Sequence, residues 1–360
     1  MKLSFQILIL ILIVVSCENG PNNPNYTLNQ FSNKSVYILC EGVWGSNNSS
    51  LSRIDFNYNS IINNYIEYIN PNIHLGDIAN NMVLFGDTIF IAVTTSQTIE
   101  AISASTGKWL NRIILEGHKA PRNICIINDS TAFFTDLYDN SIQEFNPRLF
   151  KLKNRKISVG PAPEGITCYE SKLFIANSGY GDILANKPKA GTISVIDIQS
   201  GIETQLLTNV PDVIEVLVSK KLNSLFALYN NLPSLKDSLG GIVQYDLNSL
   251  NEINRWFLHP KCMKLSVTED SLLFFNSNSV YYIELKKSQQ INLLIQNPNI
   301  NNLWYSYAIS PFDNSIWVGN ANNFQINGGI LVYNLNYPNM LLNKFTIGIN
   351  PNTILFYEKK

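Results

Sequence analysis

The chain has 360 residues, of which 45% are hydrophobic, and its formal net charge is −1. A charge so close to zero creates no field that would attract nucleic acid, and the length is ample for a large hydrophobic core. We therefore expect one folded body that does not bind nucleic acid.

Residues 1–16 are predicted to be a secretory signal. Met1-Lys2 supplies one positive charge, and Leu3–Val15 is an almost unbroken apolar run that is too short for a membrane-spanning helix. The letters VVSC, which end at Cys17, resemble a bacterial lipobox. This resemblance implies cleavage before Cys17 and a lipid anchor on its thiol. The alternative is an ordinary signal peptide in which Cys17 has no role.

Residues 17–34 are predicted to be the lipidated cysteine and a flexible tether. The stretch after Cys17 is rich in Asn and Pro and shows no periodic apolar pattern. The folded body would then comprise residues 35–360 and stand clear of the lipid.

From residue 35 onward the pattern predicts short β-strands that recur in units. The first unit has strands at Val36–Glu41, Leu51–Phe56 and Ile61–Tyr68. Further units follow at a spacing of about 40–50 residues, which is typical of β-propellers. They span Leu75–Gly107, Ala120–Asn146, Gly160–Gly201, Val210–Ser249, Pro260–Leu285 and Asn302–Leu335.

The two ends of the chain are predicted to complete one blade. The first unit lacks its opening strand, and Thr353–Tyr357 is left over at the C-terminus. Pairing these segments would close the ring and remove exposed strand edges at its ends. The sequence therefore predicts an all-β fold, a seven-bladed β-propeller of four-stranded antiparallel blades. Little helix is expected, because no long window carries a helical apolar stripe.

The connections between strands are predicted to be asymmetric. Long loops follow the second strands of four units, whereas the connections on the other face are mostly tight turns. Because the strands are antiparallel, these loops share a face with the starts of the first strands. Long loops on a rigid scaffold often carry binding residues, although simple insertions are the alternative. The loops are Val43–Ser50, Asn177–Ala190, Tyr229–Leu239 and Asn320–Gly328.

The candidate binding residues form a mixed polar and aromatic rim on this face. Such a rim suits a sizeable amphipathic small molecule, because rings offer area for stacking and polar groups orient the ligand. Aromatic residues that only fill space between blades are the alternative. The loops contribute Trp44, Asn47, Tyr138, Tyr180, Tyr229 and Phe324. The starts of the first strands contribute Asp77, Arg122, Asn123 and Glu164, with Asp212, Glu215, Lys261 and Tyr305 on the same face.

No motif in the sequence indicates a metal site or a catalytic site. His74, His118 and His259 belong to different unit junctions and have no partner at ligand spacing. Propeller lactonases place a Glu at a strand start beside a divalent cation, and Glu164 could take that role with Asn and Asp of other blades. We expect no metal, no cofactor and no enzymatic activity, and keep a metal-dependent lactonase-like hydrolase as the alternative.

Four cysteines follow Cys17, each in or beside an apolar run and without CxxC spacing. Buried free thiols are expected, and a disulfide in an oxidising envelope is the alternative. The four are Cys40, Cys125, Cys168 and Cys262.

The repeat resembles a known family. The letters GPAPEG at 160–165, LFIAN at 173–177 and ISVID are similar to the YVTN-type propeller repeat of secreted and surface proteins. The letters ILCEGVWGSNNSSLSRIDF, LGDIANN, PRNI, PEGI and the ending IGINPNTILFY resemble YncE-like propeller lipoproteins of Bacteroidetes. The best-understood of these capture cobalamin and pass it to a TonB-dependent transporter. The resemblance marks Trp44, Asn123 and Glu164 as candidate ligand contacts.

We therefore expect a lipid-anchored, monomeric binding protein of the outer membrane or cell surface. It would capture a small organic ligand, with cobalamin or another corrinoid as the candidate, for a TonB-dependent receptor. The alternatives are the hydrolase named above and a scaffold for protein interactions, which a co-purified partner would favour.

Overall fold

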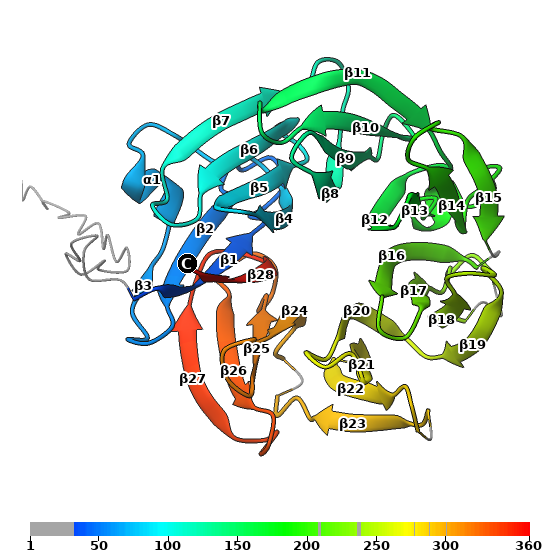
Figure 1. Cartoon of the computed structure of the whole chain (residues 1–360). Helices are drawn as coiled ribbons and strands as arrows, with labels where there is room; N and C mark the ends of the chain where they lie inside the picture. The colour runs from blue at the N-terminus through cyan, green and yellow to red at the C-terminus, as the bar shows by residue number, and fades with distance from the viewer. Residues whose placement is uncertain (1–31, 208–209, 236–238, 277, 288, 300) are drawn as a thin grey trace, which may run out of the picture.

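The computed structural model describes residues 32–360, except residues 208–209, 236–238, 277, 288 and 300. In this part of the chain, seven four-stranded antiparallel sheets are arranged in a ring (Figure 1). The predicted seven-bladed β-propeller is confirmed. The predicted signal sequence and Cys17 lie outside the described residues.

We number the blades from the one that contains the N-terminal strand and give their strands from the inside outward. Blade 1 has β28 (Pro351–Glu358), β1 (Lys34–Cys40), β2 (Ser50–Asp55) and β3 (Ile61–Ile62). Blade 2 has β4 (Ala79–Phe85), β5 (Thr88–Val93), β6 (Thr98–Ser103) and β7 (Trp109–Ile114). Blade 3 has β8 (Pro121–Asn128), β9 (Thr131–Asp136), β10 (Ser141–Asn146) and β11 (Lys151–Ser158). Blade 4 has β12 (Pro163–Tyr169), β13 (Lys172–Asn177), β14 (Thr192–Asp197) and β15 (Glu203–Leu207). Blade 5 has β16 (Asp212–Ser219), β17 (Ser224–Asn230), β18 (Gly241–Asp246) and β19 (Glu252–Phe257). Blade 6 has β20 (Pro260–Leu265), β21 (Ser271–Asn276), β22 (Ser279–Glu284) and β23 (Ile291–Ile295). Blade 7 has β24 (Trp304–Ile309), β25 (Ser315–Asn320), β26 (Gly329–Asn334) and β27 (Leu341–Thr346).

The second strands of the blades carry the aromatic residues that fill the space between blades. In five of them the third residue of the strand is aromatic, buried and packed against the next blade. Burial of such a side chain contributes roughly 1.5–3 kcal/mol to stability. Strand sequences such as TIFIAV and KLFIAN thus determine both the strand and its contact with the neighbouring blade. The five residues are Phe90, Phe133, Phe174, Phe226 and Trp317.

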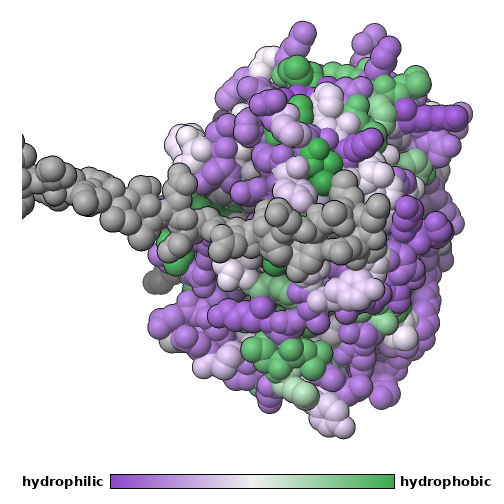
Figure 2. Space-filling view, turned by 90° about the vertical axis from the view of Figure 1, so that its left-hand side faces the viewer, coloured by the Kyte–Doolittle hydropathy of each residue, from purple (hydrophilic) through white to green (hydrophobic). Residues whose placement is uncertain are grey.

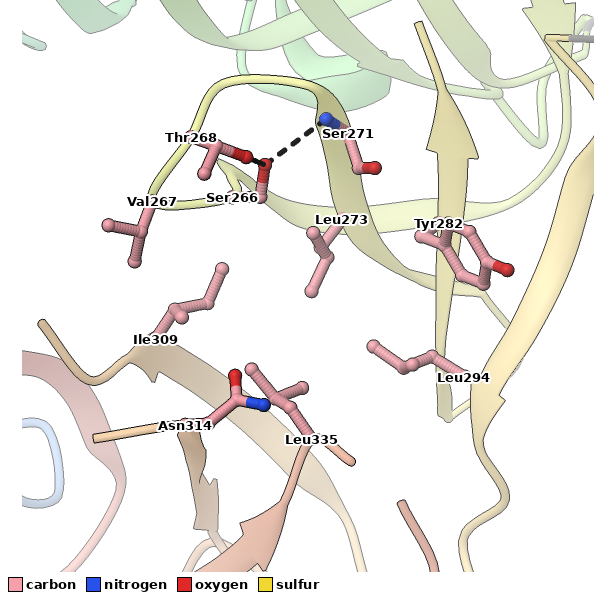
Figure 3. A pocket seen from close by; sticks show the side chains of 10 residues that line it. All are labelled: Ser266, Val267, Thr268, Ser271, Leu273, Tyr282, Leu294, Ile309, Asn314 and Leu335. Atoms are coloured by element: carbon pink, nitrogen blue, oxygen red, sulfur yellow. Dashed lines mark hydrogen bonds between the residues drawn. The ribbon is translucent and has the colours of Figure 1, made fainter. Parts of the chain in front are cut away.

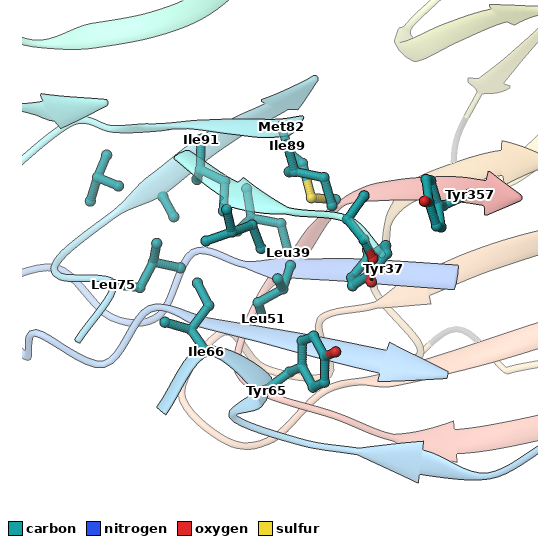
Figure 4. Close-up of a cluster of buried hydrophobic side chains, with 14 of the residues drawn as sticks. Tyr37, Leu39, Leu51, Tyr65, Ile66, Leu75, Met82, Ile89, Ile91 and Tyr357 are labelled. Atoms are coloured by element: carbon teal, nitrogen blue, oxygen red, sulfur yellow. Dashed lines mark hydrogen bonds between the residues drawn. The ribbon is translucent and has the colours of Figure 1, made fainter. Parts of the chain in front are cut away.

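The C-terminal strand closes the ring. β28 pairs with β1 along the whole length of β1. Tyr357 of β28 and Tyr37 of β1 have ring centroids 6.4 Å apart and pack in a buried cluster against blade 2 (Figure 4). The Tyr357 hydroxyl also donates to Asp87 of blade 2 at 2.6 Å. The C-terminal strand therefore completes the sheet of blade 1 and also packs blade 1 against blade 2.

One predicted strand is wrong. The sequence predicts a strand over residues 61–68, but only β3 is extended, and helix α1 (Tyr65–Ile69) follows it. Asn64 adopts a left-handed φ of 48° and turns the chain away from the sheet. Tyr65 is then buried beside β2, where its hydroxyl accepts a hydrogen bond from Arg53 at 2.7 Å. Burial of this ring outweighs the local strand pattern.

The surface near α1 is mostly polar. Figure 2 shows that this side of the molecule is mostly hydrophilic, with small separate hydrophobic patches. No helix in the described part of the chain is long and apolar enough to cross a membrane.

The four cysteines of the described part of the chain are free thiols. Cys125 in β8 and Cys168 in β12 belong to one hydrophobic cluster between blades 3 and 4.

Gly191 is expected to tolerate no side chain. It ends the long segment between β13 and β14 with a φ of 71°, and a Cβ there would lie 1.8 Å from the carbonyl oxygen of Val210. We expect Gly191→Ala to lower the free energy of unfolding by roughly 3 kcal/mol or more, because the left-handed backbone alone costs roughly 1–2 kcal/mol. Urea unfolding curves measure this loss.

The matched control lies in the same segment. Gly181 has a φ of 60°, but a Cβ there would meet nothing within 4 Å. Gly181→Ala should therefore cost only the roughly 1–2 kcal/mol of backbone strain. Equal losses in the two variants would show that the contact with Val210 is unimportant.

Candidate functional site

The long loops and the starts of the inner strands lie on one face of the ring. The last residue of a second strand lies opposite the first residue of its inner strand, as with Asn177 and Pro163, or Asn320 and Trp304. The segments that follow the second strands therefore join the inner-strand starts on this face, which we call the loop face. The sequence predicts that long segments lie on the loop face in blades 1, 4, 5 and 7.

Every inner strand carries a register shift close to its start on the loop face. A residue at such a bulge has no partner on the neighbouring strand, and its side chain is re-aimed. Most of these residues, together with Glu41, line a cavity of about 590 Å³ whose walls come from six of the seven blades. We call this cavity the channel mouth. The residues at the shifts, from blade 1 to blade 7, are Asn352, Asn80, Arg122 with Asn123, Glu164 with Gly165, Ile214, Cys262 and Tyr305.

Arg122 joins the parts of the site that belong to blades 2, 3 and 4. Its Nε and Nη2 donate to the Glu164 carboxylate at 2.8 and 3.2 Å, and its Nη1 donates to Asn80 Oδ1 at 2.7 Å. Burial lowers the pKa of Arg122, but the charges of Glu164 and Glu41 outweigh this effect and raise the pKa above its ordinary value. These bonds use three of the five N–H groups of the guanidinium. Two are left without a partner among the described residues.

Glu41 is the centre of a second cluster, which joins blades 7, 1 and 2. Its carboxylate accepts hydrogen bonds from the Tyr305 hydroxyl at 2.8 Å and from the side-chain amides of Asn80 and Asn352 at 3.0 Å each. Burial raises the pKa of Glu41, and these donors with the nearby Arg122 offset only part of the rise. The channel mouth therefore holds a carboxyl group that takes up a proton readily beside a permanent cation.

Blades 5 and 6 combine less polar bulge residues with polar residues that also line the cavity, namely Glu215, Asn230, Lys261 and Lys264. Their bulge residues are Ile214 and Cys262, and burial raises the pKa of the Cys262 thiol to about 11, so that it stays protonated near neutral pH. Farther along these strands, Lys264 Nζ lies 3.4 Å from a carboxylate oxygen of Glu215. The channel mouth is thus lined by polar residues of six blades, and two of these blades also contribute the apolar bulge residues Ile214 and Cys262.

Asn352 has an unused acceptor at this site. Its amide nitrogen donates to Glu41 and to the carbonyl oxygens of Ala79 and Asn80 at 2.8–3.0 Å. Its Oδ1 is buried and has no partner among the described residues. An unpaired buried polar atom costs roughly 1–3 kcal/mol, so a donor that entered the cavity would be stabilised there.

Glu41 is expected to make the protein less stable as the pH rises. Its pKa is higher in the folded chain than in the unfolded chain, so its stabilising contribution is complete below about pH 4.3 and is lost as the pH rises through the folded pKa. Glu41→Gln removes this titration. We expect the free energy of unfolding of the variant, relative to wild type, to rise as the pH rises above about pH 4.3 in urea unfolding experiments.

Glu252→Gln is the control, because we expect the opposite pH dependence of its free energy of unfolding relative to wild type. Hydrogen bonds with Arg255 lower the pKa of Glu252. The stability of Glu252→Gln relative to wild type should therefore fall as the pH rises toward about pH 4.3 and stay constant above about pH 5. A pH-independent difference for Glu41→Gln would show that Glu41 does not have a raised pKa.

Two residues predicted from the sequence, Arg122 and Asn123, line the channel mouth, and a third, Glu164, lies beside it and pairs with Arg122. Asn123 supports the ion pair, since its amide donates to the backbone carbonyl of Glu164 at 3.2 Å. Phe324 lies at the edge of the site, with its ring edge-on to Tyr305 and the ring centroids 5.5 Å apart. Glu215, Lys261 and Tyr305, also expected on this face, line the same cavity.

Four other predicted residues lie outside the channel mouth. Trp44 is 78% exposed, Tyr180 and Asn47 are also exposed, and the Tyr138 ring stacks on His118 with centroids 4.5 Å apart. None of the four lines the cavity. They offer surface only to a ligand that extends across the loop face.

Tyr229 and Asp77 are placed differently from the prediction. Tyr229 is the last residue but one of β17 and is buried between blades 4 and 5, because β17 extends two residues beyond the predicted strand. Its side chain is therefore not part of the rim. Asp77 is buried, and its carboxylate accepts a hydrogen bond from the backbone N–H of Gly45 at 2.9 Å. It anchors the loop that carries Trp44.

The sequence prediction missed Glu41, Asn80 and Asn352. For the two Asn residues a signal was present: five inner strands open with Pro or Ala, then a polar residue, one further residue, and Ile or Met. In four of the five, the polar residue lines the channel mouth. Glu41 has no such signal, because it reaches the site from the end of β1. The five openings are Pro351–Ile354, Ala79–Met82, Pro121–Ile124, Pro163–Ile166 and Pro260–Met263.

A smaller cavity of about 310 Å³ lies between blades 6 and 7 on the opposite face (Figure 3). Leu273, Ile309 and Leu335 point into it, and the turn at Ser266 covers one end, where the Ser266 hydroxyl accepts from the Ser271 N–H at 3.1 Å. It has no charged lining residue. The channel mouth is therefore the stronger candidate for a binding site.

The described residues do not provide an obvious metal site. Among them, no three His, Cys, Asp or Glu side chains are grouped so that they could hold a metal ion. The Glu164 carboxylate is paired with Arg122 instead. His74 lies 3.9 Å from Glu67, and His118 stacks on Tyr138.

Comparisons with known proteins identify the fold but no family. No protein-family model and no curated protein matches the chain. A quinonprotein alcohol dehydrogenase-like protein from Bacteroides thetaiotaomicron is 14% identical, with a TM-score of 0.70 over 92% of this chain and 79% of its own. A putative 6-phosphogluconolactonase from Bacteroides fragilis is 11% identical, with a TM-score of 0.65 over 90% and 98%. Apo AztD from Citrobacter koseri is 13% identical, with a TM-score of 0.59 over 90% and 97%.

The comparison corrects the prediction that the chain is not an enzyme. A protein that shares this fold over 90% of the chain is named as a lactonase, so the fold gives no reason to exclude a hydrolase. At this identity the likeness establishes the fold alone. The resemblance to YncE-like lipoproteins stays a prediction.

Proposed function

We propose that the protein binds a small polar organic molecule in the channel mouth. The observation that carries this proposal is the convergence of polar residues from six blades on one cavity, with unused hydrogen-bonding groups on Arg122 and Asn352. A purely structural network would satisfy its own buried groups. The cavity of about 590 Å³ lies within the range of roughly 300–1,000 Å³ of ordinary ligand pockets.

A thermal-shift screen of the full chain tests this proposal. Sugars, sugar lactones, sugar phosphates and amino acids are suitable compounds, and isothermal titration calorimetry would confirm each hit. Glu41→Gln and Asn352→Ala should each weaken the binding of a hit by roughly tenfold, because each removes hydrogen bonds at the site. Trp44→Ala, on the same face but outside the cavity, should leave the affinity unchanged. The proposal is wrong if no compound binds, or if hits bind equally well to Glu41→Gln.

We further propose that the protein is held at the outer membrane or cell surface by a lipid on Cys17. The direction of β1 supports this arrangement. β1 begins at Lys34 on the face opposite the loop face, so a tether over residues 17–34 would hold the loop face away from the membrane. Release of the Cys17→Ala chain from the membrane fraction, with loss of fatty-acid labelling, is the expected result. An unlabelled wild-type chain would contradict it.

We also propose that the ligand is a corrinoid and that the partner is a TonB-dependent receptor. Both proposals rest on the sequence resemblance. A corrinoid is larger than the channel mouth and would extend over Trp44, Tyr180 and Phe324. Titration with cobalamin tests it, and absence of heat at tens of micromolar would remove this ligand. Recovery of an outer-membrane receptor by cross-linking would identify the partner.

Hydrolysis of a lactone is a second candidate function, and Glu41 is the observation that favours it. A carboxylate with a raised pKa is suited to general base catalysis near neutral pH. Glu41 would accept a proton from water as the water oxygen attacks the lactone carbonyl. The free N–H groups of Arg122 would stabilise the oxyanion, and the departing ring oxygen would take the proton back.

This second function has its own test. Hydrolysis of 6-phosphogluconolactone above the spontaneous rate is expected for the wild-type chain, with a loss of roughly 100-fold or more in Glu41→Gln. A rate equal to the spontaneous one would exclude this substrate, and full activity of Glu41→Gln would exclude Glu41 as the base.

A further inference from the structure

A second cavity opens beside the channel mouth, on the loop face between blades 6 and 7. Its volume is about 330 Å³, and we call it the side pocket. It shares Lys261 and Tyr305 with the channel mouth. One ligand could therefore occupy both cavities. The other lining residues are His259, Phe275, Asn278, Leu303, Trp304 and Phe324.

The walls of the side pocket are mainly aromatic. Phe275 packs against Trp304 with ring centroids 6.2 Å apart, and Phe324 stands edge-on to Tyr305 from the loop between β25 and β26. Phe324 is 39% exposed, whereas Phe275 and Trp304 are buried. Such an arrangement offers ring faces and edges to a flat apolar group.

Polar groups without partners lie at the same pocket. Lys261, where the two cavities meet, makes no ion pair or hydrogen bond with any described residue. The indole nitrogen of Trp304 is a buried donor that also has no partner in this part of the chain. The other lysine of β20, Lys264, has Glu215 at 3.4 Å. An unpaired cation beside an aromatic pocket is complementary to an anion attached to a ring.

We propose that the side pocket binds a planar aromatic group that carries an acidic substituent, with the ring against Phe324 and Trp304 and the anion at Lys261. This inference deepens the proposed function and rests on it, because it names a chemical class for the ligand. The polar part of the same molecule would reach into the channel mouth.

Titration of the full chain with 1-naphthoate tests the inference, with 1-naphthamide as the matched neutral probe. The wild-type chain should bind 1-naphthoate. Lys261→Met should weaken this binding by about tenfold or more, as expected for loss of a charge-assisted hydrogen bond, and leave the amide unaffected. Phe324→Ala should weaken both probes. Lys108→Met, at an exposed lysine of blade 2, is the control and should change neither.

The possible outcomes test this inference and the proposed function independently of each other. Failure of 1-naphthoate to bind, or equal binding to Lys261→Met, overturns the inference, while polar ligands that depend on Glu41 would still support the channel mouth. Conversely, Lys261-dependent binding of 1-naphthoate with no Glu41-dependent ligand would support the side pocket and reject the proposed function. Both side chains are at least partly exposed, so the variants should keep the wild-type urea midpoint. If Phe324→Ala lowers the urea midpoint, the experiment uses Phe324→Leu in its place.

Discussion

A chain that ends at Asn350 is expected to lose cooperative folding. The deletion removes β28, which is the inner strand of blade 1 and pairs with β1 along its full length. It also removes Tyr357 from the cluster between blades 1 and 2, and it leaves the edge of β1 unpaired at the centre of the ring. An open ring would expose strand edges that native propellers close. Circular dichroism during urea unfolding would show a broad transition, or the chain would be insoluble.

The control for this deletion is a chain that ends at Glu358. It lacks only Lys359 and Lys360, which follow β28 and are exposed. Its unfolding curve should match that of the full chain. Addition of a peptide of residues 351–360 to the shorter chain should restore part of the cooperative transition, because the vacant position is a strand edge. Cooperative unfolding of the Asn350 chain at the wild-type midpoint would show that closure is dispensable.

The sequence could predict the ring because each blade is encoded locally. Turn residues and apolar runs recur in every unit, and the surplus C-terminal strand has only one place to pair. The error at residues 61–68 arises because the same apolar residues suit a short helix once Asn64 turns the chain. The error at Tyr229 arises because a strand that extends two residues farther changes the environment of its last side chains.

The channel mouth could be predicted only in part, because its contacts cross the whole chain. Glu41 and Tyr305 are 264 positions apart and meet only after β28 has closed the ring. Arg122 and Glu164 could be placed on the loop face from their strand starts, but their pairing depends on the bulges of neighbouring blades. Local patterns contain no information on which polar residues of different blades will share a proton or a charge.

Replacement of Arg122 is expected to cause the largest loss among single side-chain changes at the site. Arg122→Met would leave the Glu164 carboxylate, whose side chain is 12% exposed, without its bidentate partner. Breaking a fully buried pair costs roughly 3–5 kcal/mol. Because this pair borders a cavity that water can enter, we expect a smaller loss of roughly 2–3 kcal/mol in urea unfolding.

A double-mutant cycle separates the ion pair from the loss of side-chain packing. Arg122→Met with Glu164→Met removes both charges, so the double variant should be more stable than the sum of the two single losses predicts. Lys287→Met is the control for an exposed pair, because Lys287 lies 3.4 Å from Glu284 and its side chain is 75% exposed. It should cost at most about 1 kcal/mol. Strictly additive losses in the cycle would mean that Arg122 and Glu164 do not stabilise each other, and Glu164 would then not hold the cation that we propose for ligand binding in the channel mouth.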